Sequence, residues 1–138
     1  MTENENKNVN ISEEESAALA DAKKIALAAA HVLDTKKARD IKILCINEKT
    51  IIADYFVIAM GTSTTQVNSL AGEVEYKLGE DLGIHPSRTE GEGSGTWVLL
   101  DYNSVIVHVF GREAREFYKL DKLWADAEEV PFDASPEE

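Results

Sequence analysis

The sequence predicts a single α/β domain with a mixed sheet of about five strands and flanking helices. The chain has 138 residues, 43% of them hydrophobic, a size and balance that suit one core. Apolar side chains recur at helical spacing in residues 18–33 and 67–78, whereas residues 41–46, 51–60 and 96–111 are rich in branched and aromatic side chains. The second helix can connect parallel strands while the last two strands form an antiparallel pair, so a mixed sheet is expected.

The first part of the chain is expected to form a tail, a helix and two strands. Residues 1–11 are rich in Asn and Glu and are expected to be a disordered acidic tail. A helix follows, because Ser12 and the three glutamates after it resemble a capping box, and its apolar stripe continues to about Leu33. Strands are then expected at residues 41–46 and 51–60.

The middle of the chain is expected to form a second helix and a glycine-rich loop. The helix begins at Thr62 or Ser63, since a hydroxyl there can accept a hydrogen bond from the first turn, and it ends before Gly83. A short edge strand is expected around residues 87–89. Three alternating glycines within residues 91–95 precede a strand rather than a helix, so they predict a flexible loop and not a dinucleotide-binding turn.

Residues 96–111 predict a β-hairpin that turns at Asn103-Ser104. With a two-residue loop, the facing pairs are Tyr102 with Val105, Leu100 with Val107, and Val98 with Val109. This set is apolar apart from one hydroxyl and is expected to face the core. The opposite face then carries Trp97, Leu99, Asp101, Ile106, His108 and Phe110. Such a mixture suits a surface that meets a partner; the alternative is that a helix of the same chain covers it.

The last part of the chain is expected to be a helix followed by an acidic tail. The helix runs from Arg112 to about Leu120, with Arg112 and Glu116 spaced to pair. Leu120, Leu123 and Trp124 form a short apolar cluster that can close over the sheet. From Asp126 onward the chain is expected to be loose. The domain is therefore placed at residues 12–127, between an N-terminal tail, 1–11, and a C-terminal tail, 128–138.

The net charge of −12 is concentrated in the two ends of the chain. Residues 1–16 contribute −4 and residues 126–138 contribute −6, which leaves −2 for residues 17–125. Binding to a phosphate backbone needs a basic patch, so sequence-specific nucleic-acid binding is not expected. A partner with a basic surface remains compatible with this charge.

Several other classes of protein are not expected. The sequence has no apolar run of about 18 residues, which argues against a membrane protein, and residues 1–16 show no signal-peptide pattern. The single Cys45 indicates a small core residue in a reducing compartment, so a cytoplasmic location is expected. One cysteine and three widely separated histidines (His31, His85 and His108) do not predict a metal site.

An enzymatic alternative rests on the turn Gly61-Thr62-Ser63. A nucleotidyltransferase would hold phosphates at such a turn and bind metal through two carboxylates two residues apart. Glu73 and Glu75 have that spacing, but they fall within the second predicted helix, where residues two apart point in different directions. No serine, histidine and acid combination has the context of a hydrolase nucleophile, so no catalytic residues and no cofactor are assigned.

Several blocks of sequence carry a resemblance to a known family. They are Ile52-Ala53-Asp54-Tyr55-Phe56-Val57-Ile58-Ala59, Gly61-Thr62-Ser63-Thr64, Trp97-Val98-Leu99-Leu100-Asp101-Tyr102, Val105-Ile106-Val107-His108-Val109-Phe110, Arg115-Glu116-Phe117-Tyr118, and Leu120-Asp121-Lys122-Leu123-Trp124-Ala125-Asp126-Ala127. Together they resemble the ribosomal silencing factor family, also called the Iojap family. The resemblance covers roughly residues 17–127.

The resemblance implies a nucleotidyltransferase-like fold without catalytic carboxylates. It also implies a translational repressor that binds ribosomal protein fourteen of the large ribosomal subunit, keeps the small subunit from joining, and acts when nutrients are scarce. Carried onto this chain, the family's binding region corresponds to Trp97, Leu99, Asp101, Tyr102, Arg115 and Tyr118. A homodimer formed through the hairpin is an alternative use of the same surface.

Overall fold

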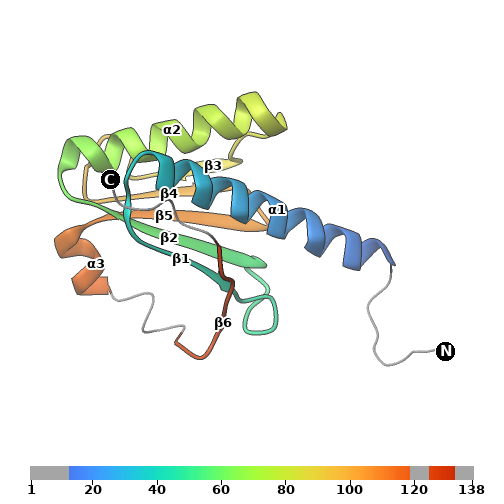
Figure 1. Ribbon diagram of the computed structural model, residues 1–138. Coiled ribbons are helices and arrows are strands. Elements are labelled where there is room, and N and C mark those ends of the chain that lie inside the picture. Colours follow the sequence, from blue (N-terminus) through green and yellow to red (C-terminus); the bar gives the residue numbers. More distant parts are fainter. Residues whose placement is uncertain (1–12, 119–124, 133–138) are drawn as a thin grey trace.

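The computed structural model describes residues 13–118 and 125–132. In chain order its elements are α1 (Glu13–Thr35), β1 (Arg39–Cys45), β2 (Tyr55–Gly61), α2 (Thr64–Leu82), β3 (Arg88–Glu90), β4 (Trp97–Asp101), β5 (Val105–Gly111), α3 (Arg112–Tyr118) and β6 (Glu128–Glu129). Helices α1 and α2 lie side by side on one face of the sheet, and α3 lies on the other (Figure 1). None of these helices combines the length and the apolarity needed to cross a membrane.

The predicted mixed sheet is confirmed, with six strands in the order β3-β4-β5-β2-β1-β6. Strands β2 and β5 are parallel at the centre, and every other neighbouring pair is antiparallel. Helix α2 connects β2 to β3, which run in the same direction, so it acts as the predicted crossover. The two central strands are buried along nearly their whole length.

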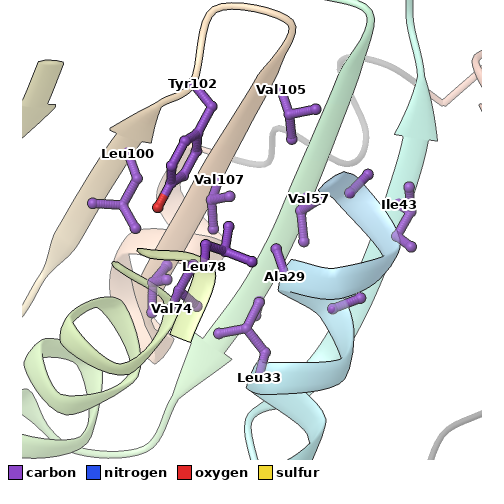
Figure 2. Packing of buried hydrophobic residues seen from close by; sticks show 14 of the residues in the cluster. Ala29, Leu33, Ile43, Val57, Val74, Leu78, Leu100, Tyr102, Val105 and Val107 are labelled. Carbon is purple, nitrogen blue, oxygen red and sulfur yellow. The ribbon is translucent and has the colours of Figure 1, made fainter. Parts of the chain in front are cut away.

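The main core lies between the sheet and helices α1 and α2 (Figure 2). Helix α1 contributes alanines at positions 22, 26, 29 and 30, whose small side chains let the helix approach the sheet closely. Helix α2 contributes Val67, Leu70, Val74 and Leu78, the residues that the helical spacing predicted. Its ends are also confirmed: the Ser63 hydroxyl accepts a hydrogen bond from the Gln66 N–H at 3.0 Å, and Gly83 ends the helix at φ 68°.

The hairpin register is confirmed. Val98 pairs with Val109 and Leu100 with Val107, and the Tyr102 N–H donates to the Val105 carbonyl at 2.8 Å. The apolar set of the hairpin belongs to the core beneath α1 and α2. The alternation of side chains along a strand was therefore sufficient to separate the two faces.

The predicted start of the second strand, at residue 51, is wrong. Strand β2 begins at Tyr55, and Ile51 and Ile52 are exposed in the loop that precedes it. The Ser104 carbonyl accepts hydrogen bonds from the N–H groups of Asp54 and Tyr55, so the pairing with the hairpin starts there. Branched side chains favour a strand, but without a neighbouring strand to accept its N–H groups this segment forms a loop.

The prediction of a loose chain from Asp126 onward is also wrong for the part that the structure describes. Glu128 and Glu129 form β6, a sixth strand beside the five expected, and pair with β1. The next residue, Val130, is 7% exposed and donates its N–H to the Ile43 carbonyl at 2.8 Å. This segment satisfies backbone groups at the otherwise open edge of β1, which outweighs its acidic composition. Ser12 and the cluster around Trp124 lie outside the described residues.

Candidate functional site

The face of the sheet opposite α1 and α2, called the outer face below, carries a second apolar cluster. The buried members of this cluster are Leu44, Ile46, Ala53, Phe56, Ile58, Ile106 and Phe110. Ala114 of helix α3 packs against it, and α3 contacts both β5 and β2. The chain therefore covers part of its own outer face. Towards β4 the cover is incomplete, because Trp97 and Leu99 are only partly buried.

Trp97 lies at this open margin with its ring held in a fixed position. The strand register places it opposite Phe110, and the two rings stack with their centroids 4.9 Å apart at an interplanar angle of 28°. The indole Nε1 donates a hydrogen bond to His108 Nδ1 at 3.2 Å. A large ring that is ordered while still reaching solvent is the usual anchor of a protein interface.

His108 is a buried neighbour of this anchor and not an exposed contact. It is 4% exposed and meets Phe56 edge to face at 4.7 Å. Burial lowers the pKa of His108 from its ordinary value of 6.5 to about 3, so the ring is neutral at physiological pH. Because Nδ1 accepts from Trp97, the proton of the neutral ring is on Nε2, for which no acceptor lies among the described residues.

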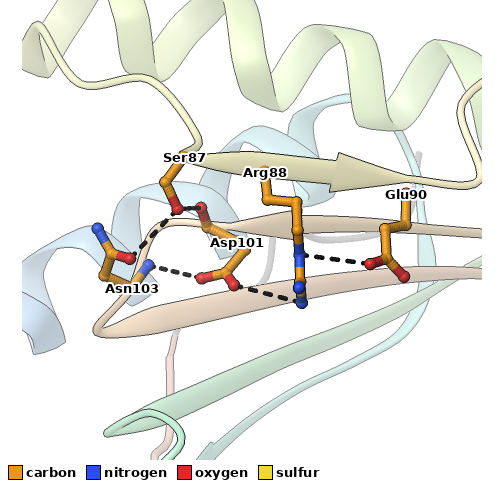
Figure 3. A network of polar contacts seen from close by, with 5 residues as sticks. All are labelled: Ser87, Arg88, Glu90, Asp101 and Asn103. Atoms are coloured by element: carbon orange, nitrogen blue, oxygen red, sulfur yellow. Dashed lines mark hydrogen bonds and ion pairs between the residues drawn. The ribbon is translucent and has the colours of Figure 1, made fainter.

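Asp101 is engaged by its own chain at the rim of the outer face (Figure 3). Its carboxylate accepts a hydrogen bond from the Asn103 N–H at 2.8 Å and lies 3.6 Å from the Arg88 guanidinium. Arg88 also lies 3.3 Å from the carboxylate of Glu90. Asn103 has a left-handed backbone with φ 73°, so the Asp101 carboxylate stabilises the turn of the hairpin.

Tyr102 lies on the other side of the sheet from Trp97. Its ring is 7% exposed and packs in the main core, beside Leu100 and near Leu78 (Figure 2). Burial and the nearby Glu75 carboxylate raise its pKa to about 12. The predicted set of contacts is therefore not one surface: the structure brings Trp97 and Leu99 together and separates Tyr102 from them.

The two predicted contacts on α3 are placed unequally. Arg115 is 9% exposed, so little of its side chain is available on the surface. Tyr118 is the last residue of the helix, and its side chain lies outside the described residues. Helix α3 lies on the same side of the sheet as Trp97, which makes its location compatible with a shared surface (Figure 1).

The Gly61-Thr62-Ser63 turn is used to begin α2. Ser63 caps the helix, and the Thr62 backbone N–H and hydroxyl both donate to Gln66 Oε1, at 2.6 and 2.9 Å. A Cβ on Gly61 would lie 2.9 Å from the side chain of Val67, so close packing explains the glycine. Glu73 and Glu75 lie on α2, and the described residues contain no cluster of three metal-ligating side chains.

Sequence reasoning missed the hydrogen bond between Trp97 and His108. The signal was available, since Leu99 faces His108 and Trp97 faces Phe110, which makes Trp97 and His108 diagonal neighbours on one face. Diagonal neighbours are within reach of long aromatic side chains. The edge network of Arg88 and Asp101 was missed because the pairing of β3 with β4 has no local sequence signal.

Comparisons with known proteins give a consistent result. The model of a family described as ribosomal silencing factor during starvation matches residues 19–138. The chain is 41% identical over 105 residues to ribosomal silencing factor RsfS of Bacillus subtilis, covering 76% of this chain and 88% of that protein. It is 33% identical over 98 residues to a mouse protein named mitochondrial assembly of ribosomal large subunit protein 1, covering 67% of this chain and 42% of the mouse protein. A crystal structure of a Chromobacterium violaceum protein superposes with a TM-score of 0.69 at 32% identity, covering 86% of this chain and 93% of that one.

Proposed function

Because the chain belongs to the ribosomal silencing factor family, we propose that it represses translation by binding the large ribosomal subunit and preventing the small subunit from joining. The family acts during starvation and is not enzymatic. The nucleotidyltransferase alternative is thereby removed, and the Gly61-Thr62-Ser63 turn has the structural role described above. We further propose that ribosomal protein fourteen is the contact on the large subunit. The name of the mouse relative, which refers to the ribosomal large subunit, supports the choice of subunit.

The proposed binding surface is the partly open margin of the outer face at Trp97 and Leu99, because these two side chains are only partly buried. Interfaces depend on a few aromatic or aliphatic anchors surrounded by polar groups. Trp97 supplies such an anchor, and Leu99 lies beside it on the same strand. The exposed Glu90 on the edge strand β3, which pairs with Leu99, would favour a basic ribosomal protein.

The other predicted contacts receive different roles in this proposal. Asp101 and Tyr102 hold the hairpin that presents Trp97, one through the turn and the other through the core. Arg115 and Tyr118 remain predicted contacts from α3. A domain bound through this surface would obstruct subunit joining by its size alone, without any chemical step. The cytoplasm is the proposed location.

The proposal is tested by sedimentation with purified large subunits. Trp97→Ala removes the anchor and is expected to lower affinity by about 2–4 kcal/mol, on the order of 30-fold to 1,000-fold. Tyr76→Ala is the matched control, because Tyr76 is an aromatic residue 61% exposed on α2, on the opposite side of the sheet. Normal pelleting of a folded Trp97→Ala protein would exclude the hairpin as the contact.

Two further measurements separate the components of the proposal. Wild-type protein is expected to reduce the formation of joined ribosomes from purified subunits, and Trp97→Ala is expected to lose this effect. Light scattering tests the homodimer alternative, in which the same surface joins two copies of the chain. A stable dimer that Trp97→Ala dissociates, with unchanged pelleting, would favour that alternative.

A further inference from the structure

The aromatic anchor is held by a hydrogen-bond acceptor that is itself buried and closely packed. The Trp97 indole N–H points to His108 Nδ1 at 3.2 Å while its ring stacks on Phe110 at 4.9 Å. His108 is in turn fixed by Phe56, which meets it edge to face at 4.7 Å, and by near-complete burial. The position of the indole therefore depends on a chain of contacts within the second cluster of the sheet.

The hydrogen bond needs His108 in one protonation state. An imidazolium carries a proton on both nitrogens and could not accept the indole N–H. Burial lowers the pKa of His108 to about 3, which keeps Nδ1 available as an acceptor at every physiological pH. Burial lowers the pKa of His108, and the neutral ring that results can accept the hydrogen bond from the Trp97 indole N–H.

We infer that His108 is a positioning residue, which holds the Trp97 indole in its binding conformation before the partner arrives. Fixing a side chain in advance removes the entropy loss that binding would otherwise impose on it. The inference rests on the proposed function, because it is measured through binding to the large subunit. The inference adds His108 to the residues that determine binding, although His108 itself touches no partner and acts only through Trp97.

The test compares large-subunit binding of the full-length wild-type protein with that of substituted proteins. His108→Phe keeps a ring in the cluster but removes the acceptor, and it is expected to lower affinity about 3-fold to 10-fold. His108→Asn offers an amide oxygen near the position of Nδ1 and is expected to recover part of that loss. In a Trp97→Phe background, which lacks the indole N–H, adding His108→Phe is expected to have no further effect.

A second measurement needs no substitution at His108. Hydrogen exchange of the Trp97 indole N–H in the free wild-type protein is expected to be slow, and the resonance is identified by its loss in Trp97→Phe. Exchange at the rate of an exposed indole would overturn the inference even if His108→Phe failed to fold. Faster exchange in a folded His108→Phe protein would support it.

The outcomes distinguish the inference from the proposed function. If His108→Phe binds as tightly as wild type while Trp97→Ala loses binding, the positioning role is wrong and the proposed surface stands. If Trp97→Ala also binds normally, the proposed function fails and the inference fails with it. An equal loss on adding His108→Phe in both backgrounds would assign His108 to general stability and overturn the positioning role.

Discussion

Two glycines of the loop before β4 have nearly the same positive φ but different surroundings. Gly91 has φ 78° and Gly93 has φ 80°, both in the left-handed region that disfavours a side chain. A Cβ at Gly91 would overlap the Trp97 carbonyl oxygen and lie 3.1 Å from the Trp97 carbonyl carbon. A Cβ at Gly93 would meet no atom within 4 Å. Substituting Gly91 and Gly93 in turn therefore separates two costs in the free energy of unfolding, that of the backbone conformation and that of a steric clash with β4.

Alanine at either position should lose the conformational advantage of glycine, about 1 kcal/mol of the free energy of unfolding. Gly93→Ala is expected to cost no more than this. Gly91→Ala must also displace the start of β4, and overpacking of this kind adds about 1–3 kcal/mol. We expect Gly91→Ala to be destabilised by about 2–4 kcal/mol in total.

Urea unfolding of the two variants measures the difference directly, and pelleting with large subunits measures its functional consequence. Because the clash is with the backbone of Trp97, Gly91→Ala is expected to weaken large-subunit binding while Gly93→Ala retains it. Equal free energies of unfolding for the two variants would refute the reasoning, since the loop would then adjust without moving β4.

Three further predictions concern single side chains. In the unfolded chain His108 takes up a proton below pH 6.5, whereas in the native protein it does so only near pH 3, so the free energy of unfolding should fall as the pH is lowered between these values, by up to about 1.4 kcal/mol per pH unit. Urea unfolding at several pH values should show a shallower fall for His108→Phe than for wild type. Parallel curves for the two proteins would contradict this. Ser63→Ala removes the cap of α2 and should cost about 1 kcal/mol in urea unfolding, an expectation that an unchanged midpoint would refute. The Tyr102 hydroxyl has no hydrogen-bond partner among the described residues, so Tyr102→Phe should leave the melting temperature unchanged or raise it, and a clear drop would reveal a missing partner.

Features set by neighbours in the sequence were predictable. The ends of α2 followed from Ser63 and Gly83, because a cap and a left-handed glycine act on the adjacent turn. The two faces of the hairpin followed from alternation and a two-residue turn. The resemblance carried together by the six blocks between Ile52 and Ala127 also identified the family, which the comparisons confirm.

Features set by distant neighbours were not predictable. Residues 51–53 have strand-like composition but pair with no strand, whereas β6 has acidic composition and pairs with β1. In both cases the deciding factor was whether a neighbouring backbone could exchange hydrogen bonds with the segment. That neighbour is far away in the sequence, so composition alone gave the wrong result twice.

The sequence by itself determined which hairpin residues share a face, because alternation is a property of the strand. Only the tertiary structure decided what covers each face. Helices α1 and α2 bury the side that includes Tyr102, while α3 covers the other side incompletely and leaves Trp97 at its margin. The acceptor role of His108 was decided in the same way, since a hydrogen bond between strands and the burial that keeps the ring neutral both arise from packing.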